Sequence, residues 1–87
     1  MQLIELKRTM DKDGWRSLAG QSQTSVGHLN NVAYGHATAN AALARRIEEL
    51  SNQQVRRWTL RPDDWHVIWP ELVGTDGAPS VPAEQGA

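Results

Sequence analysis

Apolar residues recur at helical spacing along most of the chain. Two neighbouring stretches, 15–20 and 25–34, each carry one apolar stripe, and small polar residues separate them. The stripes are formed by Trp15, Leu18 and Ala19, and by Val26, Leu29, Val32 and Ala33. Such spacing is typical of short amphipathic helices. A tight polar break between two such helices predicts a helix-turn-helix.

Further helices are predicted on either side of this motif. Residues 3–10 place leucine, isoleucine and methionine on one face, and Asn40 is expected to cap a helix over 41–51 that also has one apolar face. Gly35 is expected to end the second motif helix in a left-handed conformation. No internal repeat is present. The first two thirds of the chain are therefore expected to be all-α.

The last third of the pattern is less regular. Residues 55–60 favour extended structure, and a lone strand needs a partner, so this segment is expected to pair with its copy in a second subunit. Pro62, Asp63 and Asp64 predict the start of a helix. Its apolar stripe would be Trp65, Ile68, Trp69 and Leu72, and Pro70 would bend or limit it. About five helices and one short extended segment are expected in total.

Composition limits the size of the domain and the kinds of site it can hold. Of the 87 residues, 1–73 are expected to form one small domain and 74–87 a disordered tail. No cysteine is present, which excludes disulfides and cysteine metal sites. The first residues form no long apolar run, which argues against a signal peptide or a membrane span. A cytoplasmic protein without a bound cofactor is expected.

Charge is unevenly distributed although the net charge is only −1. Residues 1–58 carry eight lysines and arginines against five acidic residues, and the remainder carries one arginine against five acidic residues. No acidic residue lies between Asp13 and Glu48, and this window contains Arg16, His28, His36, Arg45 and Arg46. The acid-free window coincides with the helix-turn-helix, which favours an anionic partner.

The second motif helix has an outward face of uncharged polar residues. Gly27, Asn31 and Tyr34 point away from its apolar stripe, with His28 and Asn30 beside them. An asparagine can pair bidentately with adenine, which gives roughly 1–3 kcal/mol of discrimination. Gly27 would permit close approach to a duplex. Base contacts are therefore expected from Ser25, Gly27, His28, Asn30, Asn31 and Tyr34.

Several blocks of the sequence resemble the YdaS-like group of Cro-type phage and prophage regulators, over about residues 17–72. The blocks are Thr24-Ser25-Val26-Gly27-His28-Leu29, Ala33-Tyr34-Gly35-His36, Ala44-Arg45-Arg46-Ile47-Glu48, Leu60-Arg61-Pro62-Asp63-Asp64-Trp65 and Ile68-Trp69-Pro70-Glu71-Leu72. The resemblance implies a Cro/lambda-repressor-like domain that binds operators as a dimer, and some members belong to toxin–antitoxin modules. Where a typical member has glycine, this chain has Gln23 in the turn and Asn52-Gln53 after the later helix.

These observations predict a transcriptional repressor that inserts residues 25–34 into the major groove of an operator as a homodimer. Phosphate contacts are expected from Arg16, Gln23, Thr24, His36, Thr38, Arg45 and Arg46. Arg45 and Arg46 have an alternative role, since either can instead pair with Glu49.

The tryptophans and the acidic residues near the C-terminus have structural interpretations. Trp58, Trp65 and Trp69 are expected to combine core packing with a subunit contact. Asp63, Asp64 and His66 are interpreted as structural rather than as a metal or acid–base cluster, so no enzyme is expected. A toxin or antitoxin that acts on a protein partner stays open as the alternative.

Overall fold

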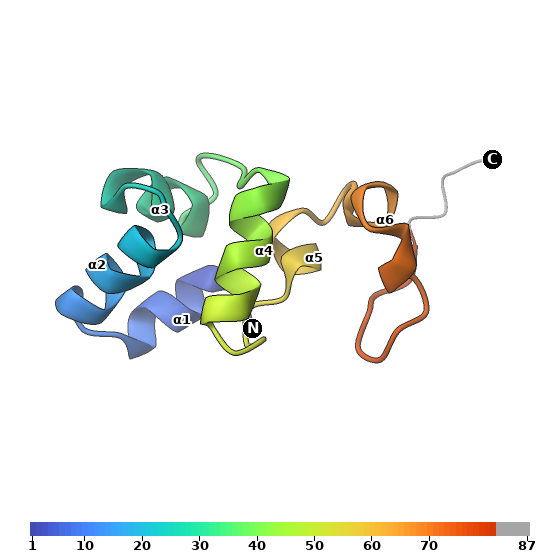
Figure 1. The fold of residues 1–87 in the computed structure, drawn as a ribbon, viewed down its shortest axis with the longest axis horizontal. Helices are drawn as coiled ribbons and strands as arrows, with labels where there is room; N and C mark the ends of the chain where they lie inside the picture. The colour runs from blue at the N-terminus through green and yellow to red at the C-terminus, as the bar shows by residue number, and fades with distance from the viewer. Residues whose placement is uncertain (82–87) are drawn as a thin grey trace.

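The chain is all-helical over residues 1–81, the part that the computed structural model describes (Figure 1). In order, its elements are α1 (Leu3–Thr9), α2 (Lys12–Gln21), α3 (Val26–Ala33), α4 (Ala41–Leu50), α5 (Arg57–Leu60), α6 (Trp65–Ile68) and the 3₁₀ helix η1 (Pro70–Leu72). α1 packs against α3, α2 against both α3 and α4, and α4 against α5. α6 and η1 lie beyond α5, at the opposite end from α2 and α3. No helix within residues 1–81 has the length and apolar character needed to cross a bilayer.

The helix starts follow from local capping. Ser25 Oγ accepts a hydrogen bond from the His28 N–H at 3.0 Å, and Asn40 Oδ1 accepts from the Leu43 N–H at 2.8 Å. Each bond satisfies a backbone donor that has no partner inside its helix. α2 starts at Lys12, earlier than the expected Trp15, because Asp11 Oδ1 accepts from the Gly14 N–H at 2.7 Å. Gly14 therefore lies in the first turn of α2.

The helices α2, α3 and α4 end in the same kind of turn. The residue after each C-cap is left-handed, with φ of 64° at Gln23, 82° at Gly35 and 57° at Asn52. The next N–H then donates five residues back, as from His36 to the Asn31 carbonyl at 2.8 Å. This is the Schellman arrangement. The left-handed conformation predicted for Gly35 is confirmed, and Gln23 adopts it without being glycine.

Gln23→Gly should therefore raise the free energy of unfolding by about 1 kcal/mol, because glycine has no Cβ to clash in a left-handed conformation. Chemical denaturation monitored by helical circular dichroism measures the change. Gln21→Gly is the matched control two residues earlier, where the backbone is helical and glycine should lower stability by about 0.5–1 kcal/mol. Equal destabilisation by both substitutions would contradict the argument.

Residues 55–60 are not extended, so the strand expected to pair with a second subunit is wrong. Arg57–Leu60 form the short helix α5. The reason is a contact from outside the segment: the Glu48 carboxylate accepts from the Arg57 N–H at 3.2 Å and so caps α5. The turn buries Trp58, and Val55 just before it is fully buried. Tertiary packing here overrides the preference of the individual residues for extended structure.

The tryptophan-rich helix is also shorter than predicted. Pro62, Asp63 and Asp64 form a turn, α6 spans only Trp65–Ile68, and Pro70 opens η1. Asp64 does not cap α6 with its side chain, because both of its carboxylate oxygens accept hydrogen bonds from Arg61, at 3.0 and 2.7 Å. Proline disfavours helical backbone at the preceding residue, which here ends α6.

The expected tail begins with ordered turns. The Thr75 N–H donates to the Leu72 carbonyl and the Ala78 N–H to the Thr75 carbonyl, each at 3.1 Å, and Ala78 packs against the core. Residues 82–87, which complete the expected tail, lie outside the described residues.

Candidate nucleic-acid interface

The outward face of α3 is the surface on which the expected base contacts lie. Ser25, Gly27, Asn31 and Tyr34 are exposed, and His28 is half-buried. Leu29 and Val32 hold the opposite face in the core. Val26, expected to point inward, is instead 36% exposed, because it is the first residue of α3 and lies at the end of the buried stripe, where solvent still reaches it.

Asn30 has a structural role that the sequence did not reveal. Its Oδ1 accepts a hydrogen bond from Trp15 Nε1 at 2.8 Å, which ties α2 to α3. Bidentate pairing with adenine needs both the oxygen and the nitrogen of the amide to face the base. The bond to Trp15 uses one lone pair of the Asn30 oxygen and holds this half-buried amide against α2. The Asn31 side chain makes no hydrogen bond to residues 1–81 and is exposed. Among the asparagines of α3, Asn31 is therefore the one suited to read a base pair.

The expected phosphate contacts come from four elements. Arg16 lies on α2, Arg45 and Arg46 on α4, and the others in the turns on either side of α3: Gln23, Thr24, His36 and Thr38. All are exposed except Thr24 and Arg46, which are half-buried. Arg16, Arg45 and Arg46 take part in no ion pair within the described chain. The alternative in which Arg45 or Arg46 pairs with Glu49 is therefore not observed.

Two other arginines, Arg56 and Arg57, form an ion cluster with the buried Glu48. The Glu48 side chain is 7% exposed and lies 2.8 Å from Arg56 Nε and 2.6 Å from Arg57 Nη2. Burial by itself would raise the pKa of Glu48, but hydrogen bonds from the side chain and backbone of Arg57 and from Arg56 outweigh it and lower the pKa. The guanidinium groups also lie over aromatic rings, Arg56 at 4.2 Å from Trp58 and Arg57 at 5.2 Å from Trp69. Both guanidinium groups are held by the fold, and the cluster of two arginines and one glutamate keeps a net charge of +1.

The three tryptophans expected at a subunit contact are core residues of the single chain. Trp58, Trp65 and Trp69 are 7%, 1% and 8% exposed. Trp58 and Trp65 meet edge to face, with ring centroids 5.8 Å apart. The core packing expected of these residues is confirmed, and their indoles leave little exposed area for the subunit contact that was also expected of them.

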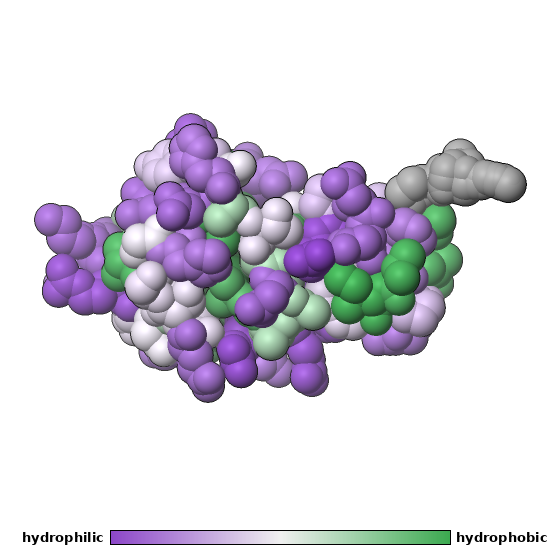
Figure 2. Space-filling view, turned by 90° about the horizontal axis from the view of Figure 1, so that it is seen from above, coloured by the Kyte–Doolittle hydropathy of each residue, from purple (hydrophilic) through white to green (hydrophobic). Residues whose placement is uncertain are grey.

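Residues 61–81, called here the C-terminal lobe, combine exposed apolar side chains with acidic charge. Val67 is 71% exposed and Val73 46%, and Figure 2 shows hydrophobic residues gathered at this end of the molecule. After Arg61 the lobe has no lysine or arginine and carries Asp63, Asp64, Glu71 and Asp76. Within residues 1–81 no group of three histidine or acidic side chains could hold a metal ion. The lobe is therefore acidic, whereas the segment around α3 has basic residues and no acidic ones.

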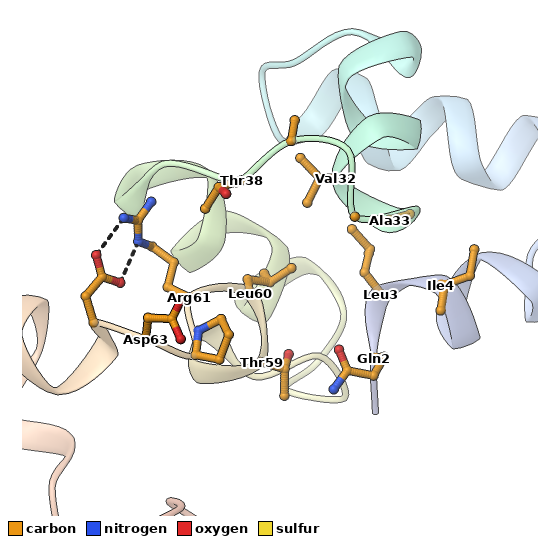
Figure 3. A pocket seen from close by; sticks show the side chains of 14 residues that line it. Gln2, Leu3, Ile4, Val32, Ala33, Thr38, Thr59, Leu60, Arg61 and Asp63 are labelled. Atoms are coloured by element: carbon orange, nitrogen blue, oxygen red, sulfur yellow. Dashed lines mark hydrogen bonds and ion pairs between the residues drawn. The ribbon is translucent and has the colours of Figure 1, made fainter. Parts of the chain in front are cut away.

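A cavity of about 460 Å³ lies between the start of α1, the loop after α3 and the turn between α5 and α6 (Figure 3). Thr38, one of the expected phosphate contacts, lines it together with apolar side chains such as Leu3 and Leu60. Arg61 stabilises one wall of the cavity. Its Nη1 donates a hydrogen bond to the Ala39 carbonyl at 2.7 Å, and its Nη2 donates to the Asp64 carboxylate. This contact fixes the loop after α3 against the C-terminal lobe.

No protein-family model matches the chain, and comparison with curated proteins finds no similar sequence.

Proposed function

We propose that this protein is a sequence-specific DNA-binding repressor that places α3 in the major groove of an operator. The observation that carries the proposal is the outward face of α3, which is exposed, lacks carboxylates and centres on the uncommitted amide of Asn31. The major groove admits an α-helix, and the pattern of donors and acceptors there distinguishes all four base pairs. Occupying an operator would exclude polymerase.

The packing around α3 supports precise docking. The Schellman turn that ends α2 and the hydrogen bond from Trp15 to Asn30 fix the position of α3 relative to α2. Unpaired arginines on α2 and α4 supply charge for the phosphates, which position a protein on the duplex without reading its sequence. A reading helix held by its neighbours, with cations on either side, has the properties needed for an operator complex.

A homodimer is part of the proposal, because one copy presents a single reading helix and dimers read two half-sites about one helical turn apart. Duplexes selected from a random pool by the wild-type protein should contain an inverted repeat, and titration should give two chains per duplex. The DNA upstream of the gene is the first natural sequence to footprint. A selected pool without any shared sequence would contradict base-specific reading.

Asn31→Ala should reduce discrimination between the selected duplex and a scrambled one by about 1–3 kcal/mol, while leaving binding to the scrambled duplex unchanged. Fluorescence anisotropy with both duplexes measures the difference. Gln54→Ala, an exposed amide outside the motif, is the control and should leave both affinities intact. Equal loss on both duplexes would show that Asn31 does not read sequence.

A toxin or antitoxin directed at another protein is the second candidate. The exposed valines of the acidic C-terminal lobe favour it, since exposed apolar patches mark sites of protein association. Growth arrest that persists when Asn31 and Arg46 are both changed to alanine would support this role and would count against the DNA-directed one.

A further inference from the structure

A lysine from α1 reaches the end of the outward face of α3. The Lys7 ammonium lies 5.6 Å from the ring centroid of Trp15 and 5.6 Å from that of Tyr34. These aromatic side chains belong to α2 and to the C-cap of α3, so three elements meet at one cation. Tyr34 is 55% exposed and follows Asn31 by three residues, which places both on one side of α3. Lys7 therefore borders the proposed reading surface.

The charge of this lysine is not neutralised by the protein. Lys7 is half-buried and forms no ion pair within residues 1–81. Aromatic faces attract the ammonium electrostatically but carry no net charge. The two rings thus hold the cation in place while leaving its full charge for an external anion.

The position of Lys7 matters because the two ends of α3 differ electrically. At the first turn, free N–H groups and the helix dipole favour a phosphate. The last turn is the negative end of the helix dipole and repels a phosphate. The N–H groups of Gly35 and His36 donate to carbonyls of this turn, so they are not available to bind an anion. A duplex lying along α3 has phosphates near both ends. Beyond the expected phosphate contacts His36 and Thr38, which follow α3, a cation from another element would complement the C-terminal end.

We propose that the Lys7 ammonium and the Tyr34 hydroxyl together bind a DNA phosphate at the C-terminal end of α3. Lys7 supplies the charge, and the exposed phenol donates a hydrogen bond. Trp15 lies beside the lysine, and its hydrogen bond to Asn30 links α2 to α3. This inference rests on the proposed DNA-binding function and adds a residue of α1 to the contact surface.

The test is the salt dependence of binding to the selected duplex. Each phosphate neutralised by a cation contributes about −0.9 to the slope of log affinity against log salt concentration. Lys7→Gln should therefore make the slope less negative by about 0.9, and Lys7→Arg should keep it. Lys7→Met, which preserves packing on the rings, should match Lys7→Gln. Tyr34→Phe should weaken binding without changing the slope, since it removes no charge.

Lys12→Gln is the control, an exposed lysine at the start of α2 that should leave the slope at its wild-type value. If Lys7→Gln and Lys7→Met retain the wild-type slope, Lys7 only supports Tyr34 and the inference is overturned, even where affinity falls. Wild-type protein without salt-dependent binding would overturn the DNA-binding proposal itself. The two failures are therefore distinguishable.

Discussion

Glu48→Ala is expected to lower the free energy of unfolding by about 3 kcal/mol, the lower end of the range for breaking a buried ion pair. The carboxylate accepts four hydrogen bonds, one from Arg56 Nε and three from the backbone and side chain of Arg57. Removing it leaves two guanidinium groups and the first N–H of α5 without their partner. The lower end applies because the arginine side chains are 29% and 18% exposed, so water partly screens them.

Glu49→Ala is the matched control for this substitution. The neighbouring Glu49 is exposed and takes part in no ion pair within residues 1–81, so its loss should change stability by less than about 0.5 kcal/mol. Urea denaturation of the two variants and the wild type gives the comparison. Similar values for both glutamates would mean that the buried cluster does not hold α5 to α4.

The same cluster has a pH dependence whose sign follows from its chemistry. The pKa of Glu48 is lower in the folded chain than in the unfolded one, because the hydrogen bonds from Arg57 and Arg56 outweigh the effect of burial. Its stabilising contribution is therefore complete above the ordinary glutamate pKa of about 4.3 and is lost as the pH falls through the folded value. Between neutral and acidic pH, the wild type should lose more stability than Glu48→Gln does.

Trp65→Ala is expected to cost about 3–5 kcal/mol, the usual range for truncating a buried tryptophan. The side chain is 1% exposed and meets Trp58 edge to face. Its removal leaves a cavity where the C-terminal lobe joins α5. The total free energy of unfolding of a domain of this size is small, so a loss of this magnitude is a large fraction of it. Denaturation followed by circular dichroism measures the loss.

Val67→Ala serves as the comparison for the tryptophan, since it lies two residues away on α6 and is 71% exposed. That substitution should alter stability by less than about 0.5 kcal/mol. A loss below about 1 kcal/mol for Trp65→Ala would show that the C-terminal lobe does not contribute to folding of the rest.

Elements with local signals were predictable from the sequence, and elements fixed by distant contacts were not. Asn40 and Gly35 mark helix ends within a few residues of themselves, and the structure places them as predicted. α5 depends on Glu48, which lies nine positions from the N–H that it caps. No pattern within 55–60 contains that information. The length of α6 was overestimated because Asp64 binds Arg61 rather than capping the helix.

The candidate site shows the same division. Helical periodicity predicted that Asn31 and Tyr34 are exposed on one side of α3, because that property depends only on the spacing along one helix. It could not show that the oxygen of Asn30 is taken by Trp15, fifteen positions away. The position of Lys7 beside two aromatic rings was not predictable for the same reason, since those rings belong to other elements of the fold.

For the proposed DNA-binding function, the acidic C-terminal lobe, at the far end of the molecule from α2 and α3, has a consequence for the approach to DNA. Its carboxylates are repelled by a polyanion while the cations near α3 are attracted, so the field of a duplex exerts a torque on the diffusing protein. The molecule would be rotated before contact, so that α3 faces the duplex and the valines of the lobe face away from it. A larger share of encounters would then begin in an orientation that can proceed to base reading.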